Sequence, residues 1–203
     1  MDESQRDELY NMNLQALQHI QQFLQGNSSA FHSLVHLFGT RAYRIIQKMI
    51  YSYHDAQDVN NEVWLKVAQN LHKYDQTFPF HSWLYRLVSN TCIDFLRKKR
   101  EITMEDDQLH HQIHKTAYTD NNPEGDYIQK EFMAHLQGLL TYLDETDRLI
   151  VTLRFTEQLS YDEIGAIVGM SKNTVGTRLF RARKELKQLF ETHVQRRVID
   201  AAY

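Results

Sequence analysis

A stretch near the end of the sequence, from Ser171 to Lys187, carries side chains that suit contact with an anionic polymer. It contains six basic residues and one acidic residue, although the whole chain of 203 residues has a formal net charge of −3. At about 100° per residue, the apolar residues of this stretch fall on one side of a helix. These apolar residues are Val175, Leu179, Ala182, Leu186 and Leu189. The opposite side is polar and cationic with one aromatic ring, and it consists of Asn173, Thr177, Phe180, Arg181 and Lys184.

The side chains on the polar side match the chemistry of double-stranded DNA. Arginine and lysine bind phosphates, asparagine, threonine and arginine read base edges, and phenylalanine can contact a thymine methyl group. We therefore expect DNA contacts from Lys172, Asn173, Thr174, Thr177, Arg178, Phe180 and Arg181. The alternative is a helical hairpin whose basic face is merely solvated.

The residues before this stretch predict a second helix and a tight turn. Ser160 and Glu163 have the spacing of a capping box, which begins a helix. Gly169 suits the left-handed residue that ends a helix, and Ser171 supplies the next N-cap. Together they predict a helix-turn-helix over residues 160–189, whose second helix would enter the major groove.

A second candidate surface follows an aromatic loop in the first half of the chain. A helix from about Ser82 to Lys99 would present an aromatic ring, amides and guanidinium groups on one side. Such side chains suit unstacked nucleotides, because bases stack on rings and cations follow the backbone. The candidate contacts are Phe80, Trp83, Arg86, Asn90, Arg97 and Lys98. The alternative is that Phe80 and Trp83 complete the core and the basic run is a solvated helix end.

A third candidate surface is acidic. Asp55, Asp58 and Glu62 recur at steps of three and four, which places them along one side of a predicted helix, and Trp64 lies close by. Carboxylates also stabilise the first turns of a helix through its dipole, and this alternative covers Asp55 and Asp58. Glu62 and Trp64 are less well explained in that way, which favours a docking surface.

The helical period continues through most of the sequence. Only 7 Gly and 2 Pro interrupt it, so we predict an all-α fold of two small helical domains joined by an acidic linker. The predicted parts are an N-terminal helical domain (1–100, of which 1–25 include an N-terminal extension), the linker (101–128) and a C-terminal helix-turn-helix domain (129–203). Further helices are expected up to about Gln25, from Ser28 or Ser29 to about Tyr51, from near Asp55, and from about Glu145 to Phe155.

Composition excludes several classes of protein. One cysteine, Cys92, rules out an internal disulfide framework, and no apolar segment approaches the length of a membrane span, so we expect no membrane insertion. The acidic start differs from a secretion signal, which predicts a cytoplasmic protein. His110, His111 and His114 could hold a metal if helical, but no matching Cys or carboxylate cluster accompanies them. Without a nucleophile–base pair or phosphate loop, we expect no enzyme, no metal and no cofactor.

Four segments in this order resemble the extracytoplasmic-function sigma factors, the two-domain members of the bacterial sigma-70 family. The resemblance runs from about Ala30 to Leu189. The segments are Asp55–Trp64, Phe80–Leu87 with Asn90, Asp94 and Arg97 after it, Leu159–Gly165, and Thr174–Arg183. Each segment alone is weak evidence for the family, whereas four segments in this order across two domains are specific to it.

The resemblance implies a role for each candidate surface. Asp55, Asp58, Glu62 and Trp64 would dock on the clamp helices of the largest subunit of core RNA polymerase. Phe80, Trp83, Arg86, Asn90, Arg97 and Lys98 would capture melted minus-ten promoter DNA. Thr177, Phe180 and Arg181 would read the minus-thirty-five element, with Lys172 and Arg178 on phosphates. An anti-sigma factor is also implied as a partner. The rival hypothesis is a helix-turn-helix regulator that binds duplex DNA and never engages polymerase.

The sequence also departs from the pattern of the family. The family usually has glycine where this chain has Asn173, a basic residue where it has Gly176, and Leu-Pro where it has Leu143-Asp144. Glycine inside a helix costs about 1 kcal/mol relative to alanine. Gly176 also removes a basic side chain that would contact DNA. We therefore expect a promoter preference that differs from the common one.

Overall fold

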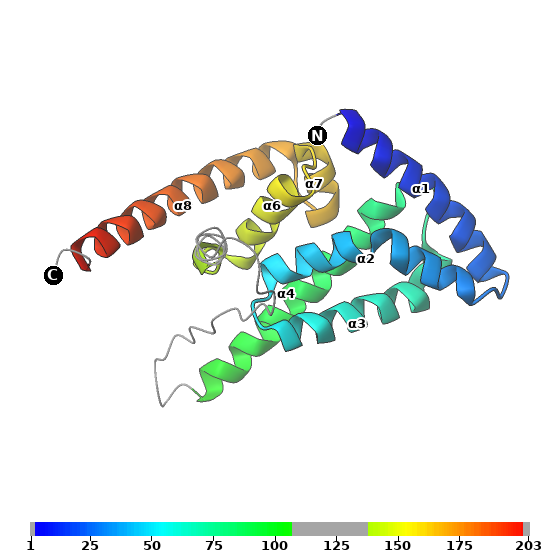
Figure 1. Ribbon diagram of the computed structural model, residues 1–203, viewed down its shortest axis with the longest axis horizontal. Helices are drawn as coiled ribbons and strands as arrows, with labels where there is room; N and C mark the ends of the chain where they lie inside the picture. The colour runs from blue at the N-terminus through cyan, green and yellow to red at the C-terminus, as the bar shows by residue number, and fades with distance from the viewer. Residues whose placement is uncertain (1–2, 107–137, 201–203) are drawn as a thin grey trace, which may run out of the picture.

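The protein is built from helices. A computed structural model describes residues 3–106 and 138–200, and the elements that lie wholly within these ranges are α-helices and one short 3-10 helix (Figure 1). This confirms the predicted all-α class for the part described. The predicted histidine cluster, most of the predicted linker and the segment before Gly138 lie outside the described residues.

The helices of the first half begin and end close to their predicted positions. They are α1 (Glu3–Leu24), α2 (Ser29–Met49), α3 (Tyr53–Asn70), the 3-10 helix η1 (Leu71–Lys73) and α4 (Phe80–Asp106). Gly26 has φ = 99° in the turn after α1, and the Ser52 hydroxyl caps α3 by accepting from the Asp55 backbone N–H. Helix α4 continues through residues 101–106, which we assigned to the linker, because no glycine or proline follows Lys99 there.

The described part of the second half contains α6 (Glu145–Thr156), α7 (Tyr161–Val168) and α8 (Lys172–Asp200) in full. Asp144 caps α6, since its side chain accepts from the backbone N–H groups of Thr146 and Asp147. The sequence before α6 is a tight turn in which Leu143 is buried. In Figure 1, α8 extends away from the other helices toward the C-terminus.

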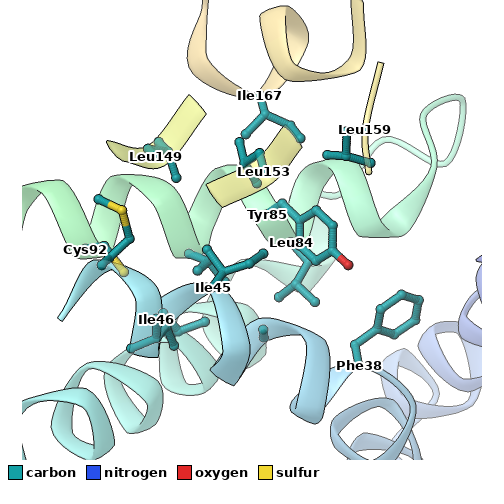
Figure 2. Packing of buried hydrophobic residues seen from close by; sticks show 14 of the residues in the cluster. Phe38, Ile45, Ile46, Leu84, Tyr85, Cys92, Leu149, Leu153, Leu159 and Ile167 are labelled. Carbon is teal, nitrogen blue, oxygen red and sulfur yellow. The ribbon is translucent and has the colours of Figure 1, made fainter. Parts of the chain in front are cut away.

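The two halves share one apolar core. Helix α6 packs on α2, and α7 packs on α4. Figure 2 shows side chains of both halves meeting in this core, and all of those labelled are buried: Phe38, Ile45, Ile46, Leu84, Tyr85, Cys92, Leu149, Leu153, Leu159 and Ile167. We predicted two domains and identified most of their apolar faces, but the sequence pattern did not indicate that these faces would pack against each other.

A buried carboxylate joins the two halves. Glu157, just after α6, accepts hydrogen bonds at Oε2 from the Tyr85 hydroxyl of α4 at 2.8 Å and from Arg41 Nη1 of α2 at 3.2 Å. Its side chain is only 1% exposed. Burial and the Glu157 carboxylate raise the pKa of Tyr85 well above its usual value, so the phenol keeps the proton that it donates.

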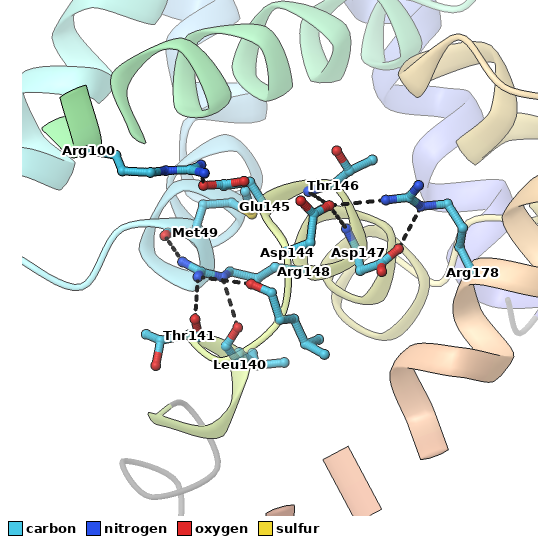
Figure 3. A network of polar contacts seen from close by, with 11 residues as sticks. Met49, Arg100, Leu140, Thr141, Asp144, Glu145, Thr146, Asp147, Arg148 and Arg178 are labelled. Atoms are coloured by element: carbon cyan, nitrogen blue, oxygen red, sulfur yellow. Dashed lines mark hydrogen bonds and ion pairs between the residues drawn. The ribbon is translucent and has the colours of Figure 1, made fainter. Parts of the chain in front are cut away.

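A buried guanidinium makes a second connection. Arg148 of α6 donates from Nη1 to the Met49 carbonyl at the end of α2, at 3.0 Å (Figure 3). It also donates to the carbonyls of Leu140 and Thr141, each at 2.9 Å. Because arginine stays charged, these carbonyls supply the hydrogen bonds that its burial requires. The turn before α6 is thereby tied to the first half of the chain.

Replacing Glu157 with alanine tests how much its buried hydrogen bonds contribute to stability. The change leaves the Arg41 guanidinium and the Tyr85 hydroxyl without their buried acceptor. We expect the free energy of unfolding to fall by about 3 kcal/mol, because two donors lose their buried acceptor and Arg41 keeps only its pair with the exposed Glu8. Urea unfolding followed by circular dichroism measures this loss.

The same arginine provides the control. Glu8 also pairs with Arg41, but its side chain is 60% exposed. Glu8→Ala should therefore cost about 0.5 kcal/mol or less. Equal losses from the two substitutions would contradict the importance that we assign to the buried carboxylate.

Candidate functional site

The predicted helix-turn-helix forms with its predicted caps. The Glu163 carboxylate accepts from the Ser160 backbone N–H at 2.7 Å, while the Ser160 hydroxyl accepts from the Glu163 N–H at 3.3 Å. Gly169 ends α7 in the left-handed region, with φ = 73°. Ser171 then caps α8, because its hydroxyl accepts from the Thr174 N–H at 3.2 Å. Local chemistry thus sets the turn between α7 and α8.

A second glycine is needed in this unit, and the sequence analysis missed its role. A Cβ atom at Gly165 would lie 2.5 Å from the Met170 carbonyl oxygen, which is too close for any side chain. The Met170 backbone N–H also donates to the Gly165 carbonyl, at 2.9 Å. Gly165 therefore lets the turn fold tightly back on α7. The sequence signal for this role was the position of Gly165, one helical turn before Gly169.

Helix α8 divides into an inner and an outer side as predicted. Val175, Leu179 and Ala182 are buried, and Leu186 is partly buried. The predicted contacts on the outer side are exposed, and they are Lys172, Asn173, Thr174, Thr177, Phe180 and Arg181. The Phe180 ring is 72% exposed, so the core does not account for it. An exposed ring among cations and amides can approach a nucleic acid.

Arg178, another predicted contact, is paired within the protein. Its guanidinium bonds Asp147 from Nε at 2.6 Å and Asp144 from Nη2 at 3.0 Å (Figure 3). Both carboxylates belong to the N-terminal end of α6 and its cap. Through these two pairs Arg178 fastens α8 to α6. The phosphate contact expected of Arg178 stays a prediction.

The polar side of α4 lies open as predicted. Arg86, Asn90, Arg97 and Lys98 are exposed along this helix. Trp83 is only partly buried, and its ring lies 5.4 Å from that of Tyr74 and 5.7 Å from that of Phe80, between centroids. One part of the indole thus belongs to the aromatic cluster and another part remains accessible.

Phe80 is a core residue, which corrects its prediction as a stacking platform. It is fully buried, and its ring meets Phe38 edge-on at 5.2 Å and Tyr74 at 5.5 Å. Phe80 is the first residue of α4, and its ring lies on the side of the helix that faces the core. The exposed ring of the preceding loop is Phe78, which is 63% exposed and whose carbonyl accepts from the Tyr74 hydroxyl. The aromatic loop was the sequence signal for an exposed ring, but it did not indicate which ring is exposed.

The acidic side of α3 is largely exposed. Asp58 and Glu62 face solvent, and Glu62 pairs with Lys66 one turn later at 2.7 Å. Asp55, partly buried, pairs with Lys99 of α4. Such pairs are worth little in water, so the carboxylates can exchange partners at small cost.

Trp64 does not belong to this surface, contrary to prediction. It is 8% exposed and meets the Phe31 ring edge-on at 6.1 Å, so it cannot reach a docking partner. Its side of α3 also carries Val63 and Val67 and faces the core. The apolar residue that lies beside Glu62 in the open is Leu65, which is 62% exposed. Leu65 stands one turn after Glu62, a spacing that the sequence analysis overlooked.

Comparison with family models assigns both halves of the chain. Residues 34–102 match the model described as Sigma-70 region 2, and residues 134–186 match Sigma-70, region 4. The first match contains the exposed sides of α3 and α4, and the second contains the helix-turn-helix.

Several characterised proteins are similar over most of the chain. The ECF RNA polymerase sigma factor SigW of Bacillus subtilis is 27% identical over 87% of this chain and 97% of its own length. The RNA polymerase sigma factor SigV of the same organism is 31% identical over 71% and 81%. The ECF sigma factor SigE of Mycolicibacterium smegmatis is 32% identical over 81% of this chain, which spans 63% of that relative.

Two solved structures share the fold. CnrH, in complex with the cytosolic domain of CnrY, superposes with a TM-score of 0.64 and 23% identity over 89% of this chain and 97% of that one. The sigma factor RpoE in complex with the anti-sigma factor NepR, from Bartonella quintana, gives a TM-score of 0.65 and 19% identity over 79% and 96%.

A pair of arginines on α8 tests the division between structural and exposed cations. We expect Arg178→Ala to lower the free energy of unfolding by about 1 kcal/mol, because it removes charge-assisted hydrogen bonds to Asp144 and Asp147. Arg181 is exposed, so Arg181→Ala should stay within about 0.5 kcal/mol of the parent. Thermal unfolding compares them, and an unchanged Tm for Arg178→Ala would contradict its structural role.

Proposed function

Because this chain belongs to the extracytoplasmic-function sigma factors of the sigma-70 family, we propose that it directs core RNA polymerase through three surfaces, on α3, α4 and α8. As an alternative sigma factor it serves transcription initiation, and it forms no chemical bond itself. The observation that best supports this assignment is that cations and an aromatic ring are exposed on the outer side of α8, the second helix of the helix-turn-helix.

The outer side of α8 reads the minus-thirty-five element in the major groove. Arg181 and Asn173 can form paired hydrogen bonds with base edges, and Phe180 can meet a thymine methyl group. Lys172 pairs with the exposed Asp162, at 2.6 Å, so a phosphate can replace that carboxylate at little cost. Arg178 pairs with Asp144 and Asp147 and holds the helix in place.

The open side of α4 handles melted minus-ten DNA. Arg86, Arg97 and Lys98 supply cations for the backbone of a single strand, and Asn90 supplies an amide for a base edge. The accessible part of Trp83 and the exposed ring of Phe78 offer stacking surfaces near the start of the helix. Phe80 contributes by supporting Trp83 from within the core.

The exposed side of α3 docks on the clamp helices of the largest subunit of polymerase. Asp58 and Glu62 supply negative charge, and Leu65 adds an apolar contact beside Glu62. Charged groups around an apolar residue are typical of the rim and centre of a protein interface. Asp55 has a smaller part, because its side chain is less exposed than those of Asp58 and Glu62.

An anti-sigma factor is a further expected partner. The related structures of CnrH and RpoE are complexes with CnrY and with the anti-sigma factor NepR. We expect a protein of the same kind to hold this chain inactive in the cytoplasm, where polymerase is found. In the parts of the chain that the structure describes, no helix has the length and hydropathy to cross a membrane.

Transcription with purified core polymerase tests the proposal. The chain should bind core and yield run-off transcripts from a subset of genomic fragments. A helix-turn-helix regulator independent of polymerase would bind duplex DNA yet leave core unchanged, and it would also leave the region 2 match without a purpose. Absence of core binding would overturn the proposal.

Glu62→Lys tests the docking surface. Reversing this exposed charge should weaken binding to core about tenfold, because it replaces a carboxylate that we assign to the interface with a cation. Glu191→Lys makes the same change of charge at an exposed site of α8 and should leave core affinity unchanged. Fluorescence anisotropy with labelled protein gives both affinities. If Glu62→Lys binds core as tightly as the control variant, the acidic side is merely solvated.

Arg181→Ala tests the reading of duplex DNA. If this guanidinium bonds a base, binding of holoenzyme to a promoter should weaken by about 1 to 3 kcal/mol, with little change on random duplex. Lys172→Ala, which removes a phosphate contact, should weaken both by similar factors. Competition between labelled promoter and random DNA separates the two cases. Equal losses for Arg181→Ala on both DNAs would demote it to a phosphate contact.

A further inference from the structure

A shallow hollow lies on the outer side of the helix-turn-helix. It is lined by Tyr161, Lys172, Asn173, Gly176, Thr177 and Phe180. Five of these residues belong to α8, while Tyr161 is the first residue of α7 and comes from across the turn. The sequence pattern singled out Gly176 and Phe180 but indicated no role for Tyr161.

Packing does not require a glycine at position 176. A Cβ atom there would lie 3.5 Å from Cε2 and 3.6 Å from Cδ2 of the Tyr161 ring, which is ordinary van der Waals contact. Glycine inside a helix is less favourable than alanine, so this chain carries an unfavourable residue where a small side chain would fit. Local rules are broken in this way mainly at functional sites. The missing side chain keeps the floor of the hollow open.

The Tyr161 ring is held in place by an arginine. The guanidinium carbon of Arg154 lies 5.4 Å from the ring centroid, a cation–π distance. Arg154 is itself fixed, because Nη1 donates to the Leu159 carbonyl at 2.7 Å. A partly exposed ring is thereby held beside the bare backbone of Gly176.

The chemistry of the hollow indicates what it can accept. Tyr161 and Phe180 provide apolar walls, and the Thr177 hydroxyl already donates to the Asn173 carbonyl at 3.0 Å. Lys172 and the neighbouring Arg181 make the rim cationic, which suits a ligand within an anionic polymer. The apolar group that base edges present in the major groove is the 5-methyl group of thymine.

We infer that Tyr161, Gly176 and Phe180 form a pocket for the 5-methyl group of one thymine in the minus-thirty-five element. Tyr161 is then a specificity-determining residue contributed by the first helix of the motif. The inference rests on the proposed function, because it requires α8 to lie in the major groove of promoter DNA.

Replacing thymine with uracil tests the pocket, because the exchange removes only the methyl group. The probe is a duplex promoter fragment recovered by run-off transcription, with each thymine of the upstream element replaced in turn, and holoenzyme is the binding protein. At one position the exchange should weaken binding about three- to fivefold, the effect of leaving one methyl group unburied. At that position Tyr161→Ala should bind thymine and uracil equally.

A second variant guards against loss of folding. Gly176→Ala places a methyl group on the floor of the pocket without a clash and favours the helix, so it should fold and still lose discrimination at the same position. Phe155→Ala removes an exposed ring of α6 outside the hollow and should keep full discrimination.

Two results would overturn the inference while leaving the proposed function standing. One is a holoenzyme that transcribes the fragment but shows no uracil effect at any position. The other is a uracil effect that persists in both Tyr161→Ala and Gly176→Ala. A chain that yields no transcript with core polymerase would instead contradict the proposed function itself.

Discussion

The hydrogen-bonded carboxylate of Glu157 is the interaction on which the arrangement of the two halves depends. It is buried from solvent and held by Arg41 and Tyr85, which belong to helices of the other half. A buried charge is tolerated only when it is paired, so the packing of α6 and α7 on α2 and α4 and this ion pair require each other. The shared core uses the inner sides of α4 and α8 and leaves their outer sides exposed.

The same physical distinction, among the described residues, separates polar side chains with partners inside the protein from those that we propose for nucleic acid. Arg148 and Arg178 are both cations of the second half, yet each is occupied by carbonyls or carboxylates of the protein itself. Arg181 and Asn90 are exposed on the outer sides of their helices and stay available for a ligand. A count of basic residues therefore overestimates the surface open to a ligand, because it includes cations that already have partners inside the protein.

Local features were predictable from sequence and distant contacts were not. The capping box at Ser160 and the apolar side of α8 depend on residues within a few turns, so spacing predicts them well. Trp64 packs against Phe31, and Phe80 packs against Phe38. Spacing along one helix cannot identify such contacts, so the burial of these two rings was not predicted. The contact of Arg41 with Glu157 spans 116 positions, so the packing of the two halves was likewise beyond a sequence pattern.

We propose that one chain reads duplex DNA through α8 and melted DNA through α4. Footprinting of the holoenzyme on one promoter fragment, combined with permanganate oxidation of unpaired thymines, measures both readings in the same complex. We expect protection of the upstream duplex together with reactive thymines downstream. In Asn90→Ala the upstream protection should remain while the reactivity falls. Reactivity equal to that of the parent protein in Asn90→Ala, or protection without any melting in the parent, would contradict this account.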